Sequence, residues 1–147
     1  MCWDAGEIFP CDIRSPRLAR RFCADAIGSV LQAGPEFQTV LDDLVIVASE
    51  LVTNSVKANC TELELTLSIH RDHLRLVVGD DAPGEPRLMA AGPEDVGGRG
   101  VAITAALAQA WGVSRLPPRK RVWAELTFAP QLAANLTCSG GLRAGRL

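Results

Sequence analysis

The sequence lacks several features that would assign it to a class at once. It has no apolar run close to the roughly 18 residues that a membrane-spanning helix needs. Its start, Met1 to Asp4, has no basic stretch followed by an apolar one, so we expect no signal peptide. Its net charge is only −2, which argues against a nucleic-acid-binding surface. These absences predict a cytoplasmic protein that contacts neither membrane nor nucleic acid directly.

Paired cysteine motifs are also missing. The chain has five cysteines without Cys-x-x-Cys spacing, namely Cys2, Cys11, Cys23, Cys60 and Cys138. An odd number of scattered cysteines is typical of reduced thiols, and the spacing does not suggest a zinc site. We therefore expect neither a disulfide framework nor a metal centre built on cysteine.

The patterns that are present predict a single domain of mixed α and β structure. With 147 residues, of which 48% are hydrophobic, the chain can bury a substantial core. Helical periodicity extends from Ser15 to Leu31, and a longer helix begins at Glu36 after Gly34-Pro35. The other expected elements are strands at 7–9, 61–70, 73–79, 113–116 and 121–128, and an Ala-rich helix at 101–111 that Gly112 closes.

The order of these elements predicts the architecture. Two helices, a hairpin, a helix and a second hairpin give a two-layer α/β sandwich of the α+β type. In this fold the helices cover one face of a mostly antiparallel, mixed sheet. The domain would span residues 1–128, and residues 129–147, which show no periodicity, would form a loosely ordered tail.

The long helix carries a polar stripe. Glu50, Asn54 and Lys57 lie at i, i+4 and i+7, opposite an apolar face. An amide oxygen can bind Mg²⁺, and a carboxylate one turn earlier can accept a proton from a hydroxyl. Alternatively, the stripe is an ordinary solvated face. The apolar face comprises Leu41, Leu44, Ala48, Leu51, Val52 and Ser55.

Asp80 follows a predicted strand and precedes Pro83-Gly84. Its carboxylate could accept a hydrogen bond from an exocyclic amine such as that of adenine, and Gly84 would let the backbone approach a flat base. On its own, the segment is equally a good turn.

A glycine-rich segment, Gly97-Gly98-Arg99-Gly100, opens the predicted helix that continues from Val101. Free backbone N–H groups at a helix N-terminus suit a phosphate group, and Arg99 adds a cation. A glycine-rich segment at the start of a helix can also have a purely structural role. It is neither a P-loop nor a dinucleotide-binding turn.

Together, the order and spacing of these segments resemble the GHKL (Bergerat-fold) superfamily of ATP-binding proteins. The resemblance is closest to small actinobacterial regulators related to the RsbW and SpoIIAB anti-sigma factors, and it covers about residues 10–128. The matching segments are Glu50-Leu-Val-Thr-Asn54, Asp80-Asp-x-Pro-Gly84, Gly97-Gly-Arg-Gly100, Ala110-Trp-Gly-Val113 and Val122-Trp-Ala-Glu-Leu126.

The resemblance implies a role for each matching residue. Glu50 would be the general base, Asn54 would bind Mg²⁺ on ATP, and Asp80 would bind the adenine amine. Residues 85–97 would form a lid over the nucleotide. The remaining contacts to base or phosphate would come from Lys57, Ala82, Gly84, Gly98, Arg99, Gly100 and Val101; those of Lys57 and Arg99 are argued from charge and position alone.

The sequence departs from the family pattern at a few places. Ala82 replaces an expected glycine, which should leave the pocket intact because alanine is small. Ala58 and Asn59 stand where many relatives have a histidine. No lysine or arginine lies between Arg87 and Arg99 in the lid, so little positive charge is available to a transferring phosphate.

The resemblance therefore implies an anti-sigma-like serine/threonine protein kinase that uses ATP and Mg²⁺. Its implied partners are a sigma factor and a STAS-domain anti-anti-sigma protein, and it would form a homodimer. The alternative is a nucleotide-dependent regulatory binding module without significant kinase activity.

Overall fold

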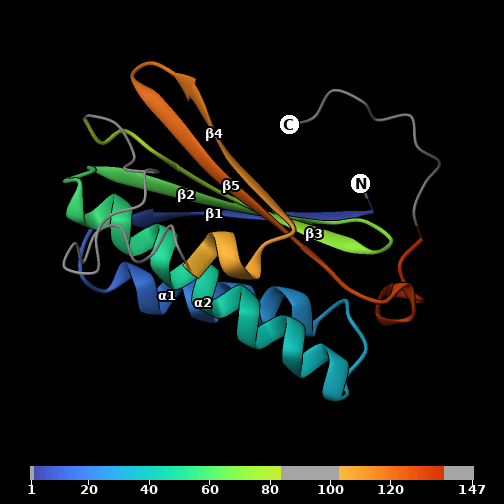
Figure 1. Ribbon diagram of the computed structural model, residues 1–147. Coiled ribbons are helices and arrows are strands. Elements are labelled where there is room, and N and C mark those ends of the chain that lie inside the picture. Colours follow the sequence, from blue (N-terminus) through green and yellow to red (C-terminus); the bar gives the residue numbers. More distant parts are fainter. Residues whose placement is uncertain (1, 84–102, 138–147) are drawn as a thin grey trace.

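The computed structural model describes residues 2–83 and 103–137 (Figure 1). Residues 103–107 are helical, and this short stretch precedes the second hairpin. The other elements, in chain order, are β1 (Trp3–Pro10), α1 (Ser15–Gly28), α2 (Pro35–Lys57), β2 (Glu62–Ile69), β3 (His73–Asp80), β4 (Ala110–Leu116), β5 (Arg119–Thr127) and the 3-10 helix η1 (Pro130–Ala133).

The strands form one sheet in the order β1-β2-β3-β5-β4, and all of these neighbours pair antiparallel. Figure 1 shows α1 and α2 lying together across one face of this sheet. The predicted two-layer sandwich with helices on one face is therefore confirmed. The described strands include no parallel pair, so this part of the sheet is antiparallel and not mixed.

Alternation along the strands places the core between the two layers. In β2 and β3 every second side chain is buried under the helices, which is what the sequence pattern predicts. Full burial of one leucine contributes about 1.5–3 kcal/mol to folding, so this layer is a major source of stability. The strand side chains with zero exposure are Leu63, Leu65, Leu67, Ile69, Leu74 and Leu76.

The opposite face of the sheet carries polar and aromatic side chains. Arg75 pairs with Glu125 at 3.0 Å, and its guanidinium carbon lies 4.3 Å from the centre of the Trp123 ring. A Cβ at Gly112 would come within 2.7 Å of that ring, so glycine is what lets β4 pass beside Trp123. A groove of about 550 Å³ runs along this face.

The predicted ends of two helices were wrong. Helix α1 ends at Gly28, although Leu31 beyond it is still buried. Trp111 and Gly112 belong to strand β4 and not to the Ala-rich helix, because backbone pairing with β5 begins at Ala110. Residues 101–102 of that helix lie outside the described residues.

The start of the predicted loose tail is ordered. Leu132 and Ala133 in η1 are buried, and the Leu132 carbonyl accepts a hydrogen bond of 2.9 Å from the Gln32 N–H. Residues 130–133 therefore pack against the domain, while residues 138–147 lie outside the described part of the chain.

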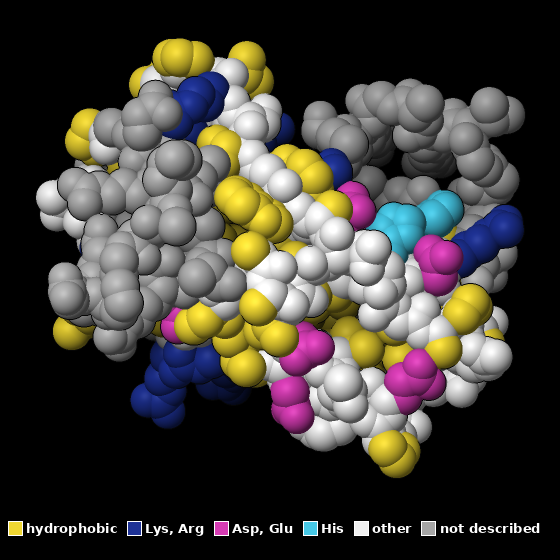
Figure 2. Space-filling view, viewed as in Figure 1, with side chains coloured by type: hydrophobic (Ala, Val, Ile, Leu, Met, Phe, Trp, Pro, Cys, Tyr) yellow, Lys and Arg dark blue, Asp and Glu magenta, His cyan; other side chains and the backbone are white. Residues whose placement is uncertain are grey.

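The surface view shows where the two histidines of the chain lie. Their side chains sit side by side at the turn between β2 and β3 (Figure 2), with the ring centres of His70 and His73 5.4 Å apart. Within the described residues, no three His, Cys, Asp or Glu side chains cluster in a way that could hold a metal ion. None of the described helices is both long enough and apolar enough to cross a membrane.

Candidate functional site

Helix α2 has the two faces that the sequence predicts. Leu44, Ala48 and Leu51 are buried against the sheet, whereas Glu50 and Asn54 are half-buried on the other side. Lys57, in the last turn, is exposed. The polar stripe therefore remains accessible along part of its length, as a ligand site would require.

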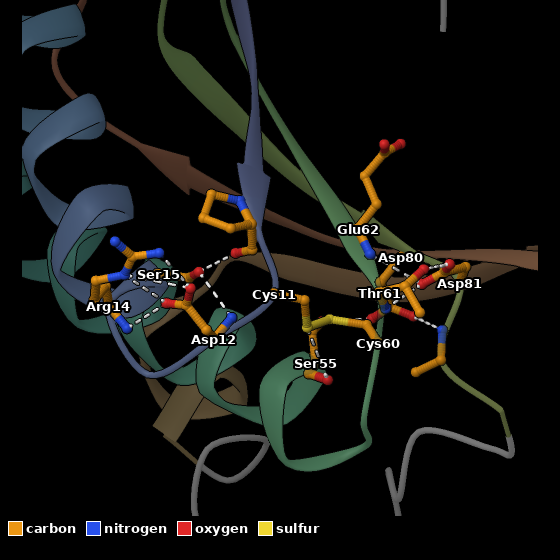
Figure 3. Close-up of a disulfide and its surroundings, with 12 residues drawn as sticks. Cys11, Asp12, Arg14, Ser15, Ser55, Cys60, Thr61, Glu62, Asp80 and Asp81 are labelled. Carbon is orange, nitrogen blue, oxygen red and sulfur yellow. Dashed lines mark hydrogen bonds and ion pairs between the residues drawn. A yellow bond between two sulfur atoms is a disulfide. The ribbon is translucent and has the colours of Figure 1, made fainter.

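Asp80 is the buried carboxylate at the end of β3, with only 2% of its surface exposed. The Ser55 hydroxyl donates a hydrogen bond to its Oδ2 atom, and the Ala82 N–H donates one of 2.9 Å to Oδ1. Ser55 lies on the buried, apolar face of α2, so this bond joins that face of the helix to the end of β3. Figure 3 shows Ser55 and Asp80 at this junction.

Lys120 is a member of this cluster that the sequence interpretation missed. It pairs with Asp80 in the β3–β5 register, and its Nζ atom lies 3.7 Å from Asp80 Oδ1. Only 7% of Lys120 is exposed. The signal was available, because Lys120 is in phase with Ala124 and Leu126, which point into the core.

The neighbouring carboxylate, Asp81, holds the backbone around the site. It accepts hydrogen bonds from the Thr61 N–H at 2.8 Å, from the Thr61 hydroxyl and from the Glu62 N–H at 3.3 Å. These bonds favour the ionised form and lower the pKa of Asp81 to about 2, the Thr61 hydroxyl having the largest effect. Asp81 thus fastens the end of β3 to the start of β2 (Figure 3).

The expectation of reduced thiols is wrong for Cys11 and Cys60, which form a disulfide with their Cα atoms 5.7 Å apart. Cys2 is disulfide-bonded as well. Cys23 remains a free thiol, and burial raises its pKa to about 12. The pairing was not visible in the sequence because 49 residues separate Cys11 from Cys60, and only the fold brings the ends of β1 and α2 together.

This disulfide touches the cluster around Asp80. The Cys60 N–H donates a hydrogen bond of 3.3 Å to the Ser55 carbonyl, and Cys11 Sγ lies 3.8 Å from the same oxygen. The backbone of Ser55 is therefore held by the disulfide segment while its hydroxyl holds Asp80.

Helix α1 approaches the stripe from the other side. Arg20 donates a hydrogen bond of 2.9 Å from its guanidinium to the Ser49 hydroxyl on α2. Ser49 directly precedes Glu50 in the chain, so this bond attaches α1 to the part of α2 that carries the predicted general base.

The structure thus brings together part of the predicted site. Asp80 and Ala82 lie together at the end of β3 and are linked to α2 through Ser55, while Glu50 and Asn54 lie one turn apart on that helix. The remaining predicted residues, Gly84, Gly98, Arg99, Gly100 and Val101, lie outside the described residues.

The cluster has an unused capacity for hydrogen bonding. An ionised carboxylate can accept about four hydrogen bonds, and Asp80 accepts two from within the described residues. Each of its two oxygens already has one donor, and no buried side-chain oxygen of the described residues is without a hydrogen-bond partner. An amino group on a ligand is a donor that would fit, as the adenine assignment requires.

Three comparisons with known proteins bear on this arrangement. The profile of the histidine kinase-like ATPase domain family matches residues 10–126. Among solved structures, the catalytic domain of the histidine kinase ThkA, in a nucleotide-free form, is similar with a TM-score of 0.51 and 12% identity. That match covers 86% of this chain and 98% of the ThkA chain, and at this identity it shows the fold alone.

No curated protein matches the sequence. The family match spans most of the chain, including every described residue of the cluster around Asp80. The chain therefore belongs to the histidine kinase-like ATPase domain family, an ATP-binding module of the GHKL superfamily.

Proposed function

We propose that this protein is an ATP- and Mg²⁺-dependent regulator with serine/threonine kinase activity. It would bind a sigma factor and phosphorylate a hydroxyl of a STAS-domain partner. The observation that carries the nucleotide part is Asp80, a buried carboxylate with acceptor capacity left over, placed beside the Asn54 helix in a chain of the ATPase family.

The adenine base and the Mg²⁺ ion would be bound by residues of different secondary-structure elements. Asp80, at the end of β3, accepts the adenine amine, and Ala82 leaves room for the base. Asn54 on α2 would supply an amide oxygen to Mg²⁺, which would neutralise charge on the phosphates. This division fits the absence of a three-residue acidic or histidine cluster within the described chain, since Mg²⁺ then arrives with the nucleotide.

The phosphates would be held by the glycine-rich segment. Backbone N–H groups at Gly98 and Gly100 would donate to phosphate oxygens, with Lys57 and Arg99 as cations nearby. Phosphoryl transfer depends mainly on positioning and on neutralising charge, so few further protein groups are needed.

Glu50 would accept the proton of the attacking hydroxyl. It is half-buried and lies one helical turn before Asn54, so the two side chains share a face of α2. The hydrogen bond from Arg20 to Ser49 fixes the adjacent part of α2. A base in this place can act on a hydroxyl that approaches Mg·ATP.

The test is transfer of labelled γ-phosphate to a purified STAS-domain protein. Wild-type protein should label a serine or threonine of the partner. Glu50→Gln should bind ATP with unchanged affinity and lose label transfer by about 10²-fold or more. Asn54→Ala should lose both ATP binding and label transfer. Thr39→Ala, a change at an exposed residue of the same helix, should keep both. Transfer by Glu50→Gln at the wild-type rate would contradict the assigned base.

A second candidate function is regulation by nucleotide-dependent binding without phosphoryl transfer. The observation that favours it is the sequence of the proposed lid, which contains Glu94 and Asp95 but no basic residue between Arg87 and Arg99. In the same assay, this function predicts ATP-dependent partner binding with no label on the partner.

A further inference from the structure

Lys120 occupies an unusual place for a lysine. It lies on the inward side of β5, directly opposite Asp80 in the strand register, and only 7% of its surface is exposed. Lysine is seldom buried so fully unless it is paired, because removing an ammonium group from water is costly. The opposite charge beside this lysine is the Asp80 carboxylate.

The ion pair between Lys120 and Asp80 does not include a direct hydrogen bond. Lys120 Nζ lies 3.7 Å from Asp80 Oδ1, beyond the roughly 2.7–2.9 Å of a direct charge-assisted hydrogen bond. An ammonium group carries three N–H donors. Within residues 2–83 and 103–137, this ammonium group makes the ion pair and no hydrogen bond. The ammonium group of Lys120 therefore has N–H donors that make no hydrogen bond within the described residues. The neighbouring Asp80 carboxylate can accept further hydrogen bonds.

The carboxylate itself is held in place by other groups. Ser55 donates to Oδ2 from α2, and the Ala82 N–H donates to Oδ1 from the segment after β3. Lys120 is thus not needed to orient Asp80. A role in contacting a ligand accounts for a lysine that is this buried and that makes an ion pair but no hydrogen bond within the described residues.

We propose that Lys120 is a specificity-determining residue of the nucleotide site, an inference that rests on the proposed function. Asp80 accepts a hydrogen bond from the 6-amino group of adenine, and the Lys120 ammonium donates one to the adjacent ring nitrogen. A donor beside an acceptor is the pattern of that edge of adenine. In a 6-oxopurine, a carbonyl oxygen would face the Asp80 carboxylate instead.

The experiment compares ATP with inosine triphosphate, which differs from ATP at this edge of the base. Calorimetric titration gives both affinities for wild-type protein and for Lys120→Met, Lys120→Gln and Lys120→Arg. Arg71→Met, which removes an exposed cation at the β2–β3 turn, is the matched control. Thermal unfolding of each variant checks that it is folded.

Wild-type protein should prefer ATP, and Lys120→Met should bind ATP about tenfold or more weakly while its affinity for inosine triphosphate changes little. Lys120→Arg should restore most of the preference, because it keeps a buried donor with a positive charge. Lys120→Gln, a neutral donor, should fall between them. If Lys120→Met does not fold, Lys120→Gln takes its place in the test. It should then show a smaller preference for ATP over inosine triphosphate than wild-type protein does.

An equal loss of affinity for both nucleotides, or an unchanged preference for ATP, would show that Lys120 is only a structural partner of Asp80 and would overturn the inference. Wild-type protein that binds neither nucleotide would contradict the proposed function, and the inference would fall with it.

Discussion

Asp80 and Asp81 are adjacent carboxylates in very different surroundings. Asp80 points into the protein, where Ser55 and Lys120 meet it, whereas Asp81 binds Thr61 where β3 ends beside the start of β2. Strand geometry sends consecutive side chains to opposite sides. As a result, Asp80 is placed to contact a ligand, while Asp81 holds the backbone next to it through its bonds to Thr61.

The low pKa of Asp81 predicts how acid affects stability. A carboxyl whose pKa is lower in the folded protein stabilises it above the unfolded value, here 3.8, and this contribution is lost as pH falls through the folded value of about 2. Asp81→Asn should therefore be less stable than wild type near neutral pH. The difference should shrink as the pH is lowered from about 4 towards 2.

Urea unfolding across that range measures this difference, because the unfolding free energy of both proteins is obtained at each pH. Asp25→Asn, a change at a largely exposed carboxylate on α1, serves as the control. A wild-type advantage over Asp81→Asn that stayed constant down to pH 2 would show that the ionised carboxylate is not what Thr61 binds.

At the scale of elements, the end of α2 is where the site is assembled. The helix brings Ser55 to Asp80, and the Cys11–Cys60 disulfide joins the chain after α2 to the chain after β1. A covalent link of this kind restricts the unfolded chain. For a separation of 49 residues, the chain-entropy relation gives about 4 kcal/mol as an upper value.

Replacing both cysteines should lower stability accordingly. We expect Cys11→Ser with Cys60→Ser to lose about 2–4 kcal/mol of unfolding free energy, as measured by urea titration under non-reducing conditions. Cys2→Ser, measured alongside, separates the contribution of a further disulfide-bonded cysteine. Equal stability of the double variant and wild type would mean that Cys11 and Cys60 are reduced in solution.

The regular elements could be predicted because their patterns are local. The alternation in β2 and β3 and the apolar face of α2 depend on residues close in sequence, and the structure confirms both. The start of β4 could not be predicted in this way. Ala110 and Trp111 continue an Ala-rich helical pattern, and only pairing with β5 makes them a strand.

At the scale of the whole molecule, the site joins segments that are far apart in the chain. The order and spacing of Glu50, Asn54 and Asp80 led to the prediction of a shared site through a resemblance to the family that the comparison shows. Lys120 was missed because its role depends on facing Asp80 across the β3–β5 register. The Cys11–Cys60 bond was missed for the same reason: both pairings are properties of the assembled sheet and helices.

The most direct test of the central claim, that Asp80 anchors the base of ATP, is calorimetric titration of Mg·ATP into wild-type protein and Asp80→Asn. Asp72→Asn, the same chemical change at the β2–β3 turn, is the control. A hydrogen bond to a charged group contributes about 1.5–3 kcal/mol, so Asp80→Asn should bind ATP roughly 10–100-fold more weakly, with the control unchanged. Equal ATP affinity in folded Asp80→Asn and wild-type protein would contradict the account.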